Sequence, residues 1–247
     1  MVNIMHGEVQ IFRDLEQLSR QAAEQFVHLA DDYQKRHNRF TVALAGGSTP
    51  KTLYHYLAST GYSERIDWSR IEFYWGDERN VPLDHPDSNY HMVQQTLLQH
   101  VPISKKNVHP IAVEKDIRHA AVNYAQLLQT QLPLVDDGIP RFDLILLGMG
   151  ADGHTASLFP QSSILHDKAM VASGYVEKLK AWRVSLTFAT INAADHVWIL
   201  ISGAEKAAAF AQLTGEHASD YPISGVRPRG ELKWLIDQTV SGETYSS

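Results

Sequence analysis

The sequence of 247 residues contains no cysteine and no long apolar run. Without cysteine, a disulfide framework, a thiolate metal site and a cysteine nucleophile are all excluded. No stretch approaches the roughly 20 apolar residues that a membrane-spanning helix needs, so we expect no membrane partner. Residues 1–12, MVNIMHGEVQIF, also lack the basic and apolar parts of a signal peptide, and we therefore expect a cytoplasmic protein.

Positive charge is also scarce. The chain has 22 Lys and Arg against 28 Asp and Glu, which gives a formal net charge of -6. Because nucleic-acid surfaces depend on clustered lysine and arginine, we expect no nucleic-acid partner. A small anionic ligand is compatible with this balance, since a few local cations suffice to hold it. The sequence makes no prediction about protein partners.

Histidine is frequent, with 13 residues, and raises the question of a metal site. The sequence has no H-E-x-x-H pattern and no compact group of histidines and carboxylates. His85 and His91 stand on either side of a short loop, and His217 is far from both. We therefore expect no metal.

Periodicity along the chain predicts an α/β fold. Residues 13–35 have apolar positions at steps of three and four, which predicts an amphipathic helix with Asp14 as its cap. Short apolar runs predict strands at 40–45, 71–75, 142–148, 183–188 and 196–202. Further helices are expected at 50–58, 89–99, around 117–128, 203–213 and 230–237. This alternation indicates a largely parallel sheet flanked by helices on both faces, and with no linker in view we expect a single domain over 1–247.

Ligands of such sheets bind at the carboxyl ends of the strands, so the loops after predicted strands are the candidate site. The first loop reads AGGSTPKTL, residues 45–53. Its glycines permit a tight turn, and we expect Thr49 to cap the next helix with Pro50 in the first turn. Backbone N–H groups and two hydroxyls at a helix N-terminus form a suitable phosphate seat. An ordinary strand-to-helix turn has the same features.

The second loop reads WGDERNVPLDHPDSNY, residues 75–90. Asp77, Glu78 and Arg79 follow an apolar strand directly, in a position where catalytic groups often occur. A solvated strand end would show the same three charges, so both interpretations stay open.

The third loop, LLGMGADGHTASLFP at 146–160, contains the pattern G-x-G-x-x-G after an apolar strand. A dinucleotide-binding loop requires a long helix next and an acidic residue about 20 positions later. Pro160 limits the helix, and Asp167 and Glu177 both miss the expected spacing. We therefore expect no dinucleotide and no other cofactor.

The same loop places Asp152 two residues before His154. Histidine can act as a general base near neutral pH, and the aspartate could orient the histidine or a substrate. A turn aspartate beside a structural histidine is an equally good interpretation of these residues alone.

The fourth loop, ILISGAEKAAAF at 199–210, has Ser202 and Glu205 at the spacing of a capping box, so we expect the helix to begin at Ser202. Lys206 would then oppose the helix dipole, by a few tenths of a kcal/mol, unless an anion binds at that end. Arg183, at the start of the preceding strand, could converge on the same anion. Both cations could equally be ordinary surface residues.

Taken together, these loops resemble the 6-phosphogluconolactonase family. The matching segments follow the family's order and approximate spacing from residue 10 to about 240: AGGSTP at 45–50, WGDERNVP at 75–82, HPDSNY at 85–90, LLGMGADGHTASLFP at 146–160, RVSLTF at 183–188 and SGAEKAAA at 202–209. The family shares its fold with glucosamine-6-phosphate deaminase. The resemblance implies a modified Rossmann-like fold that binds no dinucleotide, in which the glycines serve a sugar phosphate.

The implied activity is hydrolysis of 6-phospho-D-glucono-1,5-lactone to 6-phospho-D-gluconate in the oxidative pentose phosphate pathway. His154 would be the general base that activates a water, and Asp152 would help to place that water or the sugar hydroxyls. The substrate, a sugar-phosphate lactone, is the only partner implied.

The resemblance also implies the substrate contacts. Gly47, Ser48, Arg183 and Lys206 would bind the phosphate. The sugar part of the site would be lined by Asp77, Arg79 and Asn89. Arg79 is the candidate for stabilising the oxyanion.

Two departures from the family pattern leave roles open. The prolines that commonly precede the arginine of RVSLTF are replaced by residues 179–182, LKAW, where Lys180 could add to the phosphate site. Near the end of the chain, Arg227 could be structural or ligand-facing.

Two other functions are consistent with the same loops. Amino-sugar phosphate deaminases of this superfamily have a glutamate five positions after the motif histidine, where this chain has Phe159, which favours the lactonase. A non-catalytic sugar-phosphate sensor is the second alternative, although no DNA-binding segment is visible.

Overall fold

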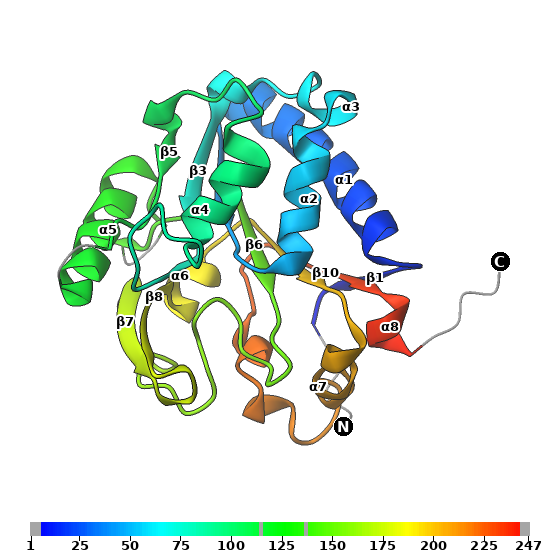
Figure 1. Ribbon diagram of the computed structural model, residues 1–247, viewed down its shortest axis with the longest axis vertical. Coiled ribbons are helices and arrows are strands. Elements are labelled where there is room, and N and C mark those ends of the chain that lie inside the picture. Colours follow the sequence, from blue (N-terminus) through cyan, green and yellow to red (C-terminus); the bar gives the residue numbers. More distant parts are fainter. Residues whose placement is uncertain (1–5, 114–115, 136–137, 243–247) are drawn as a thin grey trace.

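The computed structural model describes residues 6–113, 116–135 and 138–242, and within them the strands form two sheets (Figure 1). The strands are β1 (Glu8–Phe12), β2 (Phe40–Leu44), β3 (Ile71–Trp75), β4 (Asp77–Arg79), β5 (Val108–His109), β6 (Leu144–Gly148), β7 (Val171–Val176), β8 (Ala181–Leu186), β9 (His196–Ile201) and β10 (Glu231–Asp237). The helices are α1 (Leu15–His37), α2 (Ser48–Ala58), α3 (Thr60–Ser63), α4 (Asn89–Val93), α5 (Ile117–Gln131), α6 (Phe188–Ile191), α7 (Ala207–Gln212) and α8 (Gln238–Ser241).

The larger sheet has the order β1-β10-β9-β6-β2-β3-β5, and all its neighbouring strands run parallel. Its central strands are continuous apolar runs, as expected for a sheet that is buried on both faces. The predicted α/β class with a largely parallel sheet is therefore confirmed. Because the strands are parallel, the loops after β2, β3, β6 and β9 all emerge at one edge.

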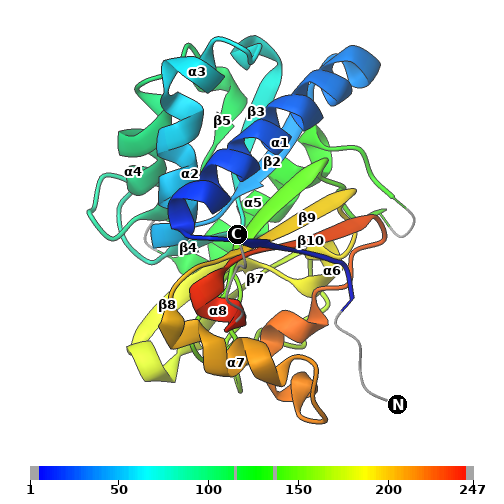
Figure 2. The same cartoon turned by 90° about the vertical axis from the view of Figure 1, so that its right-hand side faces the viewer.

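Helices cover both faces of this sheet. α1 and α2 lie on one face and α5 lies on the other (Figures 1 and 2). On the first face, the Phe26 ring of α1 meets the Phe40 ring of β2 edge to face. On the second, the Tyr124 hydroxyl of α5 donates to the backbone oxygen of Trp75 at 3.1 Å, at the end of β3.

The smaller sheet is antiparallel and has the order β4-β8-β7. β4 follows directly after β3 of the larger sheet, so the chain passes from one sheet to the other at the carboxyl edge. Residues 183–188 were expected in the parallel sheet, but Arg183 lies in β8, opposite Arg79 of β4.

The predicted helix over 230–237 is wrong, because these residues form strand β10. Leu232, Leu235 and Ile236 are spaced as on one face of a helix, but β10 lies between β1 and β9 and is covered on both faces. The pairing of β10 with its two neighbours therefore outweighs the helical spacing of its apolar residues. β1, β4, β5 and β7 were not predicted.

Two predicted helix starts also differ. Gly47, with φ of 98°, is the cap of α2, and Thr49 lies buried inside the first turn. The Ser202 hydroxyl donates to the Asp237 carboxylate instead of capping a helix. A 3-10 turn over Ala204–Lys206 precedes α7. By contrast, Asp14 caps α1 as predicted, by accepting a hydrogen bond from Gln17 N.

Within the part of the chain that the structure describes, no helix combines the length and the apolar character needed to cross a membrane.

Candidate active site

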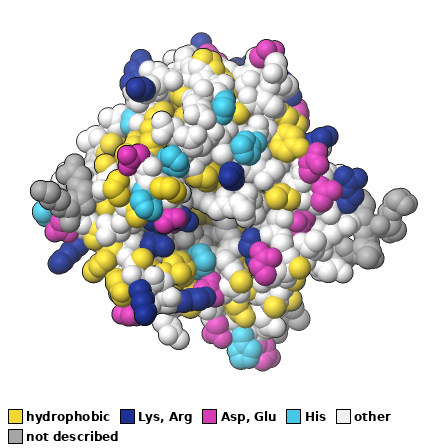
Figure 3. Space-filling view, viewed as in Figure 1, with side chains coloured by type: hydrophobic (Ala, Val, Ile, Leu, Met, Phe, Trp, Pro, Cys, Tyr) yellow, Lys and Arg dark blue, Asp and Glu magenta, His cyan; other side chains and the backbone are white. Residues whose placement is uncertain are grey.

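A cavity of about 170 Å³ opens at the carboxyl edge of the parallel sheet. Figure 3 shows a hollow near the middle of this face, with acidic, basic and histidine side chains around it. Segments 45–50, 77–89, 148–156 and 200–206 line the cavity. Most of the predicted site residues are thereby brought together, namely Gly47, Ser48, Asp77, Arg79, Asn89, His154 and Lys206.

The loop after β2 forms one wall. The Tyr54 hydroxyl holds this loop from inside, because it both accepts from Ala45 N and donates to Ala45 O. Gly46 lies directly against Asn89, and a Cβ at Gly46 would stand 1.9 Å from the Asn89 Oδ1. Any side chain at Gly46 would therefore displace Asn89 from the cavity.

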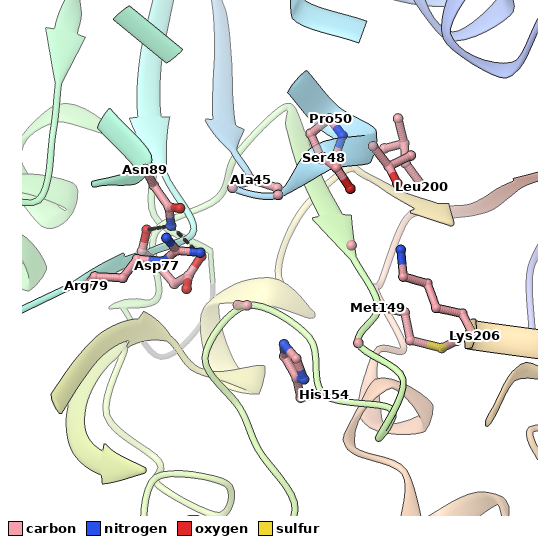
Figure 4. A pocket seen from close by; sticks show the side chains of 16 residues that line it. Ala45, Ser48, Pro50, Asp77, Arg79, Asn89, Met149, His154, Leu200 and Lys206 are labelled. Atoms are coloured by element: carbon pink, nitrogen blue, oxygen red, sulfur yellow. Dashed lines mark hydrogen bonds between the residues drawn. The ribbon is translucent and has the colours of Figure 1, made fainter. Parts of the chain in front are cut away.

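Asp77 and Asn89 form a second wall, which adjoins the first at Gly46 and lies across the cavity from Lys206, as Figure 4 shows. Asn89 Nδ2 donates to the Asp77 backbone oxygen at 2.9 Å and to Asp77 Oδ1 at 3.2 Å. Ser157 donates to Asp77 Oδ2 at 2.6 Å. Since both carboxylate oxygens have a partner, Asp77 is held in one orientation at the cavity surface.

Arg79 extends from β4 beside this pair. Its Nη1 donates to the Asp87 backbone oxygen at 2.6 Å, which ties the loop after β4 to the strand. Its side chain lines the cavity and places a fixed positive charge on the same wall as Asp77.

Glu78 was noted in the sequence only as one of three charges, and the structure shows it fully buried. Its carboxylate accepts hydrogen bonds from the backbone N–H groups of Arg79, Asn89 and Tyr90 and from the Ser88 hydroxyl. Burial raises the pKa of Glu78, although these hydrogen bonds oppose the shift. Glu78 therefore organises the loop that carries Asn89. No local sequence pattern predicts this role, because all its donors except Arg79 N belong to residues 88–90, ten or more positions along the chain.

His154 projects from the loop after β6. Its Nδ1 lies 2.5 Å from Asp152 Oδ1, and Lys178 Nζ donates to the other oxygen, Oδ2, at 2.8 Å. Burial alone would raise the pKa of Asp152, but the hydrogen bonds from Lys178 and His154 outweigh it and lower the pKa to about 2. Asp152 is therefore an anion at neutral pH and fixes one edge of the imidazole.

Glycine is required in this loop at position 150. A Cβ at Gly150 would stand 2.1 Å from the His154 ring and 2.9 Å from Asp152 Oδ1. The second glycine of the G-x-G-x-x-G pattern thus provides the space into which the histidine and the aspartate fold.

Lys206 approaches from the far side of the cavity, and its ammonium points toward the side where Ser48 lies (Figure 4). Its Nζ donates to the Ser202 backbone oxygen at 2.7 Å, and its side chain is only 15% exposed. A half-buried cation beside the start of α2 provides a positive end to the cavity.

Arg183 does not line the cavity that contains Lys206. It lines an adjoining space of about 820 Å³ together with Asp152, Lys178 and Lys180, while its Nη1 donates to the Trp182 backbone oxygen. Burial and the nearby Arg79 guanidinium lower the pKa of Arg183. Arg79 and His154 border both spaces, so the two adjoin at these residues.

Arg227, whose role the sequence left open, donates from Nε to the Ser224 backbone oxygen and borders neither space. Within residues 6–113, 116–135 and 138–242, no group of three or more histidines and carboxylates is arranged to hold a metal ion.

Comparison with known proteins identifies the family. The family model described as glucosamine-6-phosphate isomerases/6-phosphogluconolactonase matches residues 13–234. The chain belongs to this family.

Individual members of the glucosamine-6-phosphate isomerase/6-phosphogluconolactonase family are similar over nearly the whole chain. A 6-phosphogluconolactonase from Nostoc sp. is 37% identical over 243 residues, covering 97% of this chain and 99% of that protein. The solved structure of 6-phosphogluconolactonase from Trypanosoma brucei has 30% identity and a TM-score of 0.83, over 96% of this chain and 98% of that one. A crystal structure described as devB protein has 32% identity and a TM-score of 0.89, over 96% and 99%.

Proposed function

We propose that this protein hydrolyses 6-phospho-D-glucono-1,5-lactone to 6-phospho-D-gluconate in the oxidative pentose phosphate pathway, with residues 1–247 as one lactonase domain. The observation that carries the proposal is the position of His154, anchored by Asp152 on a cavity whose far side carries Lys206 and the start of α2. The relatives named 6-phosphogluconolactonase support the same activity.

In this proposal the phosphate binds where the cavity is positive. Lys206 supplies a charge, and Gly47 and Ser48 supply a backbone N–H and a hydroxyl at the start of α2. We place Arg183 as a further phosphate contact, which requires its guanidinium to turn away from the Trp182 carbonyl and to pass from the adjoining space into the cavity that contains Lys206.

The lactone ring then lies between the two walls. Asp77 and Asn89 take the sugar hydroxyls. Arg79 stabilises the negative charge that develops on the carbonyl oxygen, because a preformed cation at that position needs no rearrangement during the reaction.

His154 is the general base. An Asp152 carboxylate that accepts from Nδ1–H leaves Nε2 as the nitrogen with a free lone pair. Nε2 removes a proton from a water molecule as the water oxygen bonds to the lactone carbonyl carbon. The tetrahedral intermediate then expels the ring oxygen, which takes the proton back from the imidazolium. A lactone is an activated ester, so one base and one anchored phosphate suffice.

Freshly prepared 6-phosphogluconolactone tests the activity. The substrate also hydrolyses spontaneously, so the measured quantity is the increase in rate over buffer. We expect His154→Gln to lower kcat by roughly 10²–10⁴-fold with little change in affinity for 6-phosphogluconate. His55→Gln, on the exposed side of α2, is the matched control and should keep full activity.

Three outcomes would contradict parts of the proposal. A His154→Gln enzyme with the wild-type rate would exclude His154 as the base. Robust ammonia release from glucosamine-6-phosphate by the wild type would favour the deaminase. Binding of 6-phosphogluconate without any turnover of the lactone would favour the sensor.

A further inference from the structure

Lys178 stands in a 3-10 turn over Glu177–Leu179, at the tip of the hairpin between β7 and β8. The hairpin belongs to the antiparallel sheet, whereas Asp152 and His154 follow β6 of the parallel sheet. The hydrogen bond from Lys178 Nζ to Asp152 Oδ2 therefore joins the two sheets beside the proposed base.

We propose that Lys178 is a positioning residue that acts on His154 through Asp152. The inference rests on the proposed function, because it assigns His154 the task of a base. Lys178 does not touch the imidazole. It holds one carboxylate oxygen while the other oxygen holds His154 Nδ1.

The geometry of Asp152 supports this role. Backbone hydrogen bonds from Gly150 N to His154 O and from Gly153 N to Gly150 O fix the path of the loop. The same loop also holds one carboxylate oxygen, because His154 N donates to Asp152 Oδ1 at 3.3 Å. Lys178 is the partner of the other oxygen, Oδ2, so the hairpin lysine adds the contact that fixes how the carboxylate faces the imidazole.

Other charged groups also face His154. The cavity that contains Lys206 is also bordered by Asp77 and Arg79. The adjoining space is bordered by Asp87, Lys180 and Arg183. All of them stay in place when Lys178 alone is changed. The effect of Lys178 can therefore be separated from theirs by substitution.

The experiment compares Lys178→Met, Lys178→Arg and Lys168→Met. Lys168 is the matched control, because it is exposed and lines neither of the two spaces. The first measurement is the NMR signal of the His154 ring nitrogens at one fixed pH, assigned by its loss in His154→Gln, which reports the hydrogen bond between Nδ1 and Asp152. The second is kcat and KM for the lactone.

We expect Lys178→Met to shift and broaden the His154 Nδ1 signal, because the Asp152 carboxylate loses one of its partners. kcat should fall about two- to fivefold while KM stays within about twofold. Lys178→Arg should restore the wild-type values, and Lys168→Met should not change them.

Two results would overturn the inference. An identical His154 ring signal in the wild type and in Lys178→Met would show that the lysine does not act on the imidazole. A raised KM with an unchanged kcat would show that Lys178 binds substrate instead. If the wild type fails to hydrolyse the lactone, the proposed function is wrong, whereas the NMR signal still reports whether Lys178 acts on His154.

Discussion

The Phe159 ring stacks on the His154 imidazole, with 4.0 Å between the ring centroids and 23° between the ring planes. Phe159 covers one face of the imidazole while Asp152 holds its Nδ1 edge. The ring is therefore fixed both in position and in rotation. Phe159 therefore restrains the imidazole, and a glutamate at the same position could not provide the same flat apolar surface.

Substitution of the motif glycines should separate their roles. Gly150→Ala should lower kcat at least tenfold, since a Cβ there would stand 2.1 Å from the His154 ring and misplaced catalytic groups cost about that much or more. Gly148→Ala is the matched control, because its Cβ would make an ordinary contact at 3.9 Å. Lactonase kinetics and thermal unfolding of both variants check this. Equal activity in the two variants would contradict the role of Gly150.

Loss of the Lys206 charge should weaken binding of the phosphate. For Lys206→Met we expect the affinity for 6-phosphogluconate to fall by about 1–3 kcal/mol, because a half-buried charged hydrogen bond is lost. Lys51→Met removes an exposed lysine from α2 and should leave the affinity unchanged. Calorimetric titration with 6-phosphogluconate and with unphosphorylated gluconate measures both effects. A similar loss of affinity for gluconate would assign Lys206 to the sugar instead of the phosphate.

Glu78→Gln should destabilise the fold. The amide nitrogen would face hydrogen-bond donors where one carboxylate oxygen now accepts, which leaves buried groups unpaired. We expect a loss of about 2–4 kcal/mol of unfolding free energy, or a Tm lower by roughly 5–10 °C. The exposed Glu64→Gln should stay within about 0.5 kcal/mol of the wild type. Urea unfolding measures both, and an unchanged Glu78→Gln midpoint would refute the organising role.

Acid should selectively remove the contribution of Asp152 to stability. Its pKa is about 2 in the folded protein and lies near its ordinary value, about 3.9, in the unfolded chain. A lowered folded-state pKa gives stability that is fully present above the unfolded pKa and disappears as the pH falls toward 2. The contribution is at most about 2 kcal/mol, because the exposed Lys178 partner is screened by solvent. The stability difference between the wild type and Asp152→Asn should therefore narrow from pH 6 to pH 3, and a constant difference would count against the shift.

The parts of the fold that the sequence predicts are those in which local pattern and tertiary environment agree. The helix after Asp14 has both a cap and a regular apolar face, and the apolar runs of β2, β3, β6 and β9 can only be buried strands or short buried helices. In β10 the local pattern and the environment disagree. The spacing of its apolar residues also fits a helix, and only the pairing with β1 and β9 makes it a strand.

The site residues also fall into those that a local sequence pattern predicts and those that it does not. His154 and Lys206 belong to short motifs next to strand ends, and the structure brings both to one cavity. The partners that hold the site are distant in sequence and carry no motif. Glu78 depends on N–H donors beyond a loop, and Lys178 reaches Asp152 from a hairpin of the other sheet, which the sequence did not predict.

The pairing of β1 with β10 places the first and the last strand that the structure describes side by side in the sheet. During translation, residues 8–12 leave the ribosome long before residues 231–237 exist, so β1 has no hydrogen-bonded neighbour until synthesis is almost complete. Until then β9 is itself an open edge, and an unpaired edge of this kind invites association between nascent chains. A premature stop before residue 231 would therefore leave both β1 and β9 without their shared partner β10.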